Sequence, residues 1–66
     1  MFNWIQEDDI LYSEDRYFCI MTTRDNMFRL FSWDDFTNSY ESHYDDFYEL
    51  NDAKYQAWLE YVYPDK

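Results

Sequence analysis

The chain has 66 residues, and its 15 Asp and Glu against 5 Lys and Arg give a formal net charge of −10. Such an acidic surface excludes direct binding of nucleic acid, because phosphate recognition requires Lys and Arg. One cysteine excludes an intramolecular disulfide, so the core must come from the Phe, Tyr and Trp that form 26% of the chain. This length predicts a single domain over residues 1–66.

The first half of the chain predicts a small antiparallel sheet. The runs RYFCIMT over 16–22 and MFRLFSW over 27–33 are rich in aromatic and β-branched residues, and a polar loop over 23–26 separates them. The apolar run over 10–13 predicts a third strand, because a lone hairpin is marginal in water. Residues 2–5 add a fourth strand or a packed arm.

The second half predicts two helices. Ser32 is placed to cap the first, with Asp34 and Asp35 in the opening turn, where the helix dipole favours acids. Aromatic side chains then follow at spacings of 3, 4, 4 and 3, which predicts one apolar helix face. These side chains are Trp33, Phe36, Tyr40, Tyr44 and Phe47.

Asn51 is the predicted N-cap of a second helix. We expect this helix to start at Asp52 and to end at Pro64. Its apolar positions at i, i+3, i+4 and i+7 are Tyr55, Trp58, Leu59 and Val62. The predicted fold is α+β, with an N-terminal antiparallel β-hairpin or three-stranded sheet packed against two C-terminal helices. We expect the core to bury Trp33, Phe36, Tyr40, Phe47, Trp58 and Leu59.

Nothing in the sequence has the pattern of a catalytic or metal site. The single cysteine, Cys19, and the single histidine, His43, are the one possible Cys–His nucleophile pair. A cysteine inside a strand, however, usually behaves as a small hydrophobic residue. The absence of glycine excludes a glycine-rich phosphate loop, and no acidic segment has the spacing of an EF-hand. We therefore expect a non-enzymatic protein without a cofactor or a dedicated metal.

Acidic side chains follow a second stripe on the first predicted helix. Successive members lie about 5–6 Å apart along a helix axis, a pitch that can loosely match a row of phosphates. Such a run is usually a solvated face, but a charge of −10 exceeds the magnitude of about 2–8 that serves solubility in a small domain. The candidate partner-binding residues are Asp34, Asp35, Glu41, Asp45, Asp46 and Glu49.

In size, charge and aromatic content over its whole length, the chain resembles the small acidic DNA-mimic inhibitors of phages and mobile elements, of the anti-CRISPR and antirestriction kind. The resemblance implies an inhibitor that occupies the nucleic-acid groove of a basic host protein, and no motif assigns roles to individual residues. The alternative is an acidic immunity or antitoxin-like protein that neutralises a cognate basic toxin or nuclease. Both interpretations are compatible with a homodimer.

The expected location is the cytoplasm of a host bacterial cell. Residues 1–6 carry no basic region, and acids follow directly at 7–9, unlike a signal peptide. No apolar run approaches the roughly 18 residues of a membrane span, and a single cysteine suits a reducing compartment. Many residues with AT-rich codons indicate a low-GC bacterium or its phage, although a small aromatic core explains the same composition.

Overall fold

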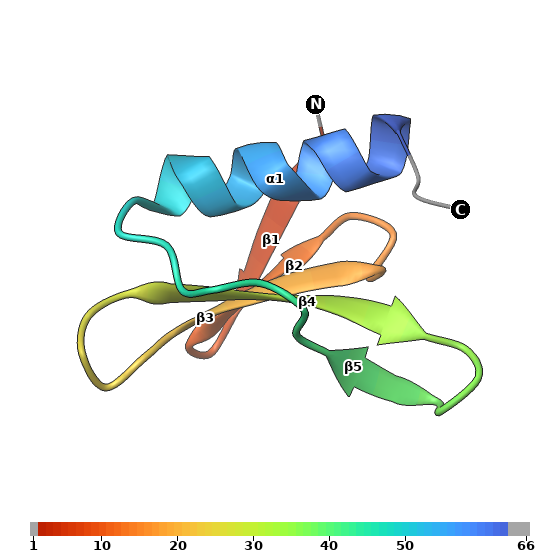
Figure 1. Cartoon of the computed structure of the whole chain (residues 1–66), viewed down its shortest axis with the longest axis horizontal. Coiled ribbons are helices and arrows are strands. Elements are labelled where there is room, and N and C mark those ends of the chain that lie inside the picture. Colours follow the sequence, from red (N-terminus) through yellow and green to blue (C-terminus); the bar gives the residue numbers. More distant parts are fainter. Residues whose placement is uncertain (1, 64–66) are drawn as a thin grey trace.

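A computed structural model describes residues 2–63, which fold into one antiparallel sheet and one helix (Figure 1). The five strands are neighbours in the sheet in the same order as in the sequence, so the sheet is a simple meander. The strands are β1 (Trp4–Glu7), β2 (Ile10–Ser13), β3 (Phe18–Thr22), β4 (Phe28–Asp34) and β5 (Ser39–Glu41). Helix α1 (Leu50–Val62) lies across one face of the sheet.

The predicted hairpin is confirmed, since β3 and β4 pair with Ile20 opposite Leu30. Their loop closes without glycine. The Thr23 hydroxyl accepts hydrogen bonds from the backbone N–H groups of Asp25 and Met27, at 3.2 and 3.1 Å, and Asn26 adopts a φ of 62°. Asn tolerates this left-handed conformation better than most residues.

The predicted third and fourth strands are also present as β2 and β1. They pair in register with Glu7 opposite Ile10, and the two-residue turn between them holds Asp8 at a φ of 57°. Phe2 precedes β1, and its ring lies 5.6 Å from that of Phe18. The N-terminal segment is therefore both an edge strand and a packed arm.

The core lies between the sheet and α1. It consists of Phe18, Ile20 and Leu30 from the strands together with Ala53 and Ala57 from the helix, each at most 2% exposed. Because the two alanines are four residues apart, they lie on one helix face. Their small side chains let the helix approach the large side chains of the sheet closely.

The prediction of a helix over 36–47 is wrong, and within residues 2–63 one helix replaces the two expected. Strand β4 continues to Asp34, whose carboxylate accepts a 2.9 Å hydrogen bond from the backbone N–H of Phe36. The N–H of Asn38 bonds to the Asp34 carbonyl at 2.7 Å, and Asn38 adopts a φ of 61°. The acids that resembled a first helical turn therefore form a hairpin turn.

The aromatic spacing has a different cause from the one predicted. Trp33 and Tyr40 are seven residues apart, like two turns of a helix, but they are cross-strand partners whose rings lie 5.1 Å apart. Tyr44 and Phe47 pack against the core from an extended segment, and Phe47 forms an isolated bridge with Phe28. A four-residue turn between paired strands reproduces the helical spacing.

The C-terminal helix is confirmed, with differences at its start and on its buried face. It begins at Leu50 with Glu49 as the N-cap instead of Asn51. Tyr55 and Val62, predicted to face the core, are 56% and 40% exposed. The predicted end at Pro64 lies outside the described residues. Large apolar side chains were predicted to form the buried face of the helix. The side chains of the sheet already fill the core, so only alanine fits where the helix approaches the sheet most closely.

The six side chains predicted to be buried divide into two groups. Phe36 is 97% exposed, which contradicts the prediction, because it occupies the β4–β5 turn instead of a helix face. The other five are partly buried: Trp33, Tyr40, Phe47, Trp58 and Leu59. No helix within residues 2–63 has the length and apolar character that a membrane span requires.

We expect the variant Ala57→Leu to lower the free energy of unfolding by about 1–3 kcal/mol, because the larger side chain forces the helix away from the sheet. Urea denaturation followed by circular dichroism measures the change. The matched control is Tyr55→Leu on the exposed face of the same helix, with an expected change within about 0.5 kcal/mol. Equal stability of the two variants would contradict the close helix–sheet contact.

Candidate functional site

Three of the six predicted binding residues share one hairpin. Asp34 ends β4, Asp35 begins the turn and Glu41 ends β5. Phe36 extends from the same turn and is almost fully exposed. We call these four residues the acidic tip: Asp34, Asp35, Phe36 and Glu41.

Two carboxylates of the acidic tip are held by neighbouring side chains. Asp35 accepts a 2.7 Å hydrogen bond from the indole N–H of Trp33. Glu41 accepts bonds from the hydroxyls of Ser39 and Thr37 at 2.9 and 3.2 Å. Because the hairpin fixes these oxygens, a partner that binds them orders few further side chains.

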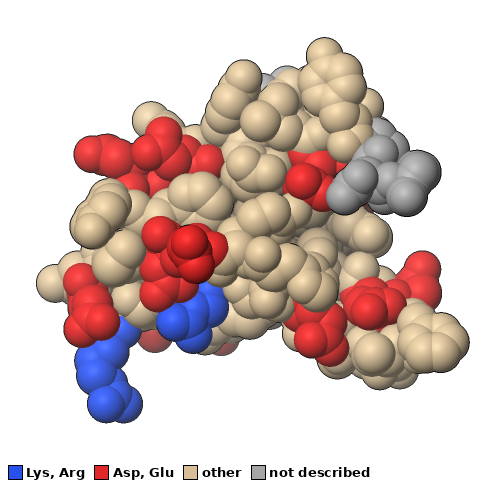
Figure 2. Space-filling view, viewed as in Figure 1, with Lys and Arg blue, Asp and Glu red and all other residues tan. Residues whose placement is uncertain are grey.

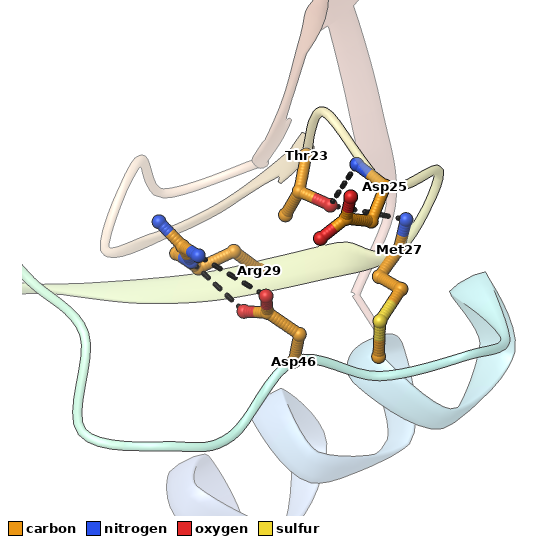
Figure 3. A network of polar contacts seen from close by, with 5 residues as sticks. All are labelled: Thr23, Asp25, Met27, Arg29 and Asp46. Carbon is orange, nitrogen blue, oxygen red and sulfur yellow. Dashed lines mark hydrogen bonds and ion pairs between the residues drawn. The ribbon is translucent and has the colours of Figure 1, made fainter.

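The other three predicted residues lie in the segment between β5 and α1, away from any helical stripe. Asp45 is exposed, and Glu49 caps α1 through its backbone carbonyl, which accepts from the N–H of Asp52 at 3.1 Å. Asp46 forms an ion pair with Arg29 through bonds of 2.8 and 3.1 Å (Figure 3). These hydrogen bonds lower the pKa of Asp46, and its charge is already compensated.

A second ion pair involves Arg16, which donates two hydrogen bonds to the carboxylate of Glu7, one of them at 3.1 Å. The same guanidinium lies over the ring of Tyr12, 4.7 Å from its centre. Within residues 2–63 the formal charge is still −10, because Asp65 and Lys66 cancel. Figure 2 shows the acids in several separate groups, while Lys and Arg gather at one corner of that face.

One end of the sheet combines two acidic connections. Successive turns of a meander lie at opposite ends, so the β2–β3 connection and the β4–β5 turn share an end. The Tyr40 hydroxyl donates a 2.6 Å bond to the Arg16 carbonyl and thereby joins β5 to the β2–β3 connection. We call the five acidic residues at this end of the sheet the acidic end: Glu14, Asp15, Asp34, Asp35 and Glu41.

Cys19 and His43 do not form a nucleophile pair in the described residues. Cys19 is buried in β3, where burial raises the pKa of its thiol to about 11, so it is protonated at neutral pH. His43 lies exposed in the segment after β5, and no hydrogen bond joins the two within residues 2–63. The same residues contain no group of three or more His, Cys, Asp or Glu placed to hold a metal ion.

Comparison of the chain with protein-family models, curated proteins and solved structures finds no match. The basis for a functional proposal is therefore the geometry and charge of the described residues. Sequence patterns missed Phe36 as an exposed residue. The signal for it was the run Asp34-Asp35-Phe36-Thr37-Asn38, in which turn-forming residues surround a single aromatic.

We expect the Cys19 thiol to react at least about 100-fold more slowly with a disulfide reagent at pH 8 in the native protein than in urea. A pKa of about 11 leaves roughly one thiol in a thousand ionised at pH 8, and burial also blocks access. Absorbance of the released thiolate measures the rate. The control variant Cys19→Ala/Ser42→Cys moves the thiol to an exposed position and should react quickly without urea. Equal native rates would contradict the burial of Cys19.

Proposed function

We propose that the protein binds and inhibits a basic, nucleic-acid-binding host protein as a nucleic-acid mimic, without catalysis, and that the acidic end makes the contact. The observation that carries this proposal is Phe36, which is 97% exposed between carboxylates of the acidic tip. An exposed aromatic ring contributes nothing to the core. It gives an interface an anchor of the kind that dominates binding energy, and the carboxylates of the same hairpin steer association.

The amount and spacing of charge support a polyanion mimic. The molecule measures 31 × 22 × 22 Å. Over 31 Å, one strand of duplex DNA carries about nine phosphates at roughly 3.4 Å each, close to the formal −10 of residues 2–63. A groove that neutralises a nucleic-acid strand therefore meets a similar total charge on this protein.

The two arginines that form ion pairs do not cancel the charge of the acidic end. Arg16 belongs to the β2–β3 connection, but Glu7 and the ring of Tyr12 already hold its guanidinium. Arg29 is engaged by Asp46. The cytoplasm of a bacterial host is the compartment in which the proposed target acts.

Competition with nucleic acid tests the function. The full chain, immobilised, captures its target from a lysate of a low-GC bacterium, and the purified target is then titrated with duplex DNA at fixed inhibitor. We expect DNA to displace the inhibitor, because one basic groove cannot neutralise two polyanions. Association should slow as ionic strength rises above about 0.15 M, where the Debye length is about 8 Å. A ternary complex with undiminished DNA affinity would contradict the proposal.

Charge variants locate the contact in the same assay. The double variant Asp34→Asn/Asp35→Asn removes two charges from the acidic tip, and Asn preserves the turn hydrogen bonds. Its matched control is Asp8→Asn/Asp9→Asn, which removes two charges from the opposite end of the sheet. The tip variant should lose at least about tenfold in association rate, and the control less than about threefold. Equal losses would mean that total charge, and not the acidic end, selects the target.

We expect Phe36→Ala to weaken target binding at least about tenfold, chiefly through faster dissociation, because it removes the central anchor. Its melting temperature should not change, since the ring is 97% exposed. Surface plasmon resonance and thermal denaturation measure the two effects. The control is Tyr48→Ala, which removes a ring that is 83% exposed outside the acidic tip. Equal binding by the two variants would remove Phe36 from the contact.

A further inference from the structure

A cavity of about 480 Å³ opens between α1, the N-terminal segment and the β2–β3 connection. Its lining combines three aromatic rings with two carboxylates of the acidic end. The lining residues are Phe2, Glu14, Asp15, Trp58 and Tyr61. Among the described residues no Lys or Arg lines it, so an apolar surface and uncompensated negative charge share one hollow.

The aromatic wall is fixed by contacts between the rings. Phe2 packs edge-on against Trp58 and Tyr61, with ring centres 5.5 and 5.0 Å apart. Trp58 and Tyr61 stack at 5.7 Å with 26° between their planes. Tyr61 nevertheless remains 56% exposed. The cavity therefore offers aromatic surface to a ligand, and the face of such a ring attracts cations.

The carboxylates at the cavity are positioned, and each keeps an oxygen for a ligand. Asp15 accepts bonds from the Ser13 hydroxyl at 2.7 Å and the Tyr17 N–H at 3.0 Å, both at Oδ1. Glu14 accepts a 3.3 Å bond from the side-chain amide of Asn3 at Oε1. Oδ2 of Asp15 and Oε2 of Glu14 remain to accept hydrogen bonds from a bound cation.

We propose that this cavity binds an arginine side chain of the protein partner. A guanidinium is planar, so it stacks flat on aromatic faces and donates two parallel hydrogen bonds to one carboxylate, a geometry that a tetrahedral ammonium group lacks. The protein already holds one arginine with the same chemistry, since Arg16 lies over Tyr12 and bonds to Glu7. That the arginine belongs to a partner rests on the proposed function.

A neighbouring cavity differs in the charge of its lining. It has a volume of about 530 Å³ and shares Phe2 as a wall, but Lys54 and Asp52 both line it. These opposite charges offset each other, so the lining of that cavity carries no net negative charge for a cation. The carboxylates at the first cavity belong to the acidic end, so an arginine bound there extends the same contact surface as the acidic tip.

Titration of the full chain with N-acetyl-arginine methylamide, followed by ¹H–¹⁵N NMR, tests the site. We expect saturable shifts of the Trp58 indole N–H and of the amides of residues 14, 15 and 61, with half-saturation at roughly 1–10 mM. N-acetyl-citrulline methylamide has the same shape without the charge, and it should bind at least about tenfold more weakly. Equal binding of citrulline, or equal shifts at Asp8 and Asp25, would overturn the proposal.

Substitutions at exposed side chains test the site without disturbing the fold. Glu14→Gln changes an exposed side chain and should weaken arginine binding about threefold or more, and Tyr61→Ala about two- to fivefold. Tyr63→Ala removes a neighbouring ring that is 72% exposed and does not line the cavity, so it should bind normally. Circular dichroism confirms folding. Unchanged binding by Glu14→Gln would overturn the proposed role of the carboxylates.

This titration contains no partner, so its failure is distinguishable from failure of the proposed function. If the arginine derivative does not bind but DNA still displaces the inhibitor from its target, the cavity proposal is wrong and the function stands. If the derivative binds as expected but DNA and the inhibitor bind the target together, the arginine site stands and the nucleic-acid mimic does not.

Discussion

The contact between Ala53 and Ala57 of α1 and the inner face of the sheet is the constraint on which the rest of the molecule depends. A helix of 13 residues packs against one face of the sheet, chiefly on β3 and β4, and the core that results contains few residues. A domain of this size has little apolar surface to bury. Close approach of the helix to the sheet therefore stabilises the core more than larger helix side chains would. Since the core uses so little of the chain, the connections at the sheet ends remain outside it, and most of the acids lie in them or at the strand ends beside them.

The strands were predictable because their signal is local. Aromatic and β-branched runs separated by polar residues predicted β2, β3 and β4, and the helix after residue 50 was predicted by its apolar spacing. The helix over 36–47 failed because a spacing of seven fits two helical turns and also a hairpin with a four-residue turn. Pairing of Trp33 with Tyr40 and the left-handed Asn38 decide between them. A pattern within one segment does not report which segment lies beside it.

The candidate site was predictable in part for the same reason. Asp34, Asp35 and Glu41 share one hairpin, whereas the prediction placed them on one helix. Asp46 is compensated by Arg29, which is 17 residues away in the sequence. The aromatic cavity joins three segments spread from Phe2 to Tyr61, so only the fold reveals it. Sequence spacing finds groups within one element, whereas cavities and ion pairs form between elements.

The left-handed positions of this chain are occupied without glycine. Asp8, Arg16, Asn26 and Asn38 take φ values of 57–66° in the four connections between strands. Each accepts a conformation that costs a non-glycine residue free energy, and a chain without glycine also loses less backbone freedom when it folds. Every bend of the meander thus displays a side chain where many proteins have only a hydrogen atom. A substitution at one of these bends therefore changes the chemistry of the surface while the residues of the sheet and of its helix stay the same.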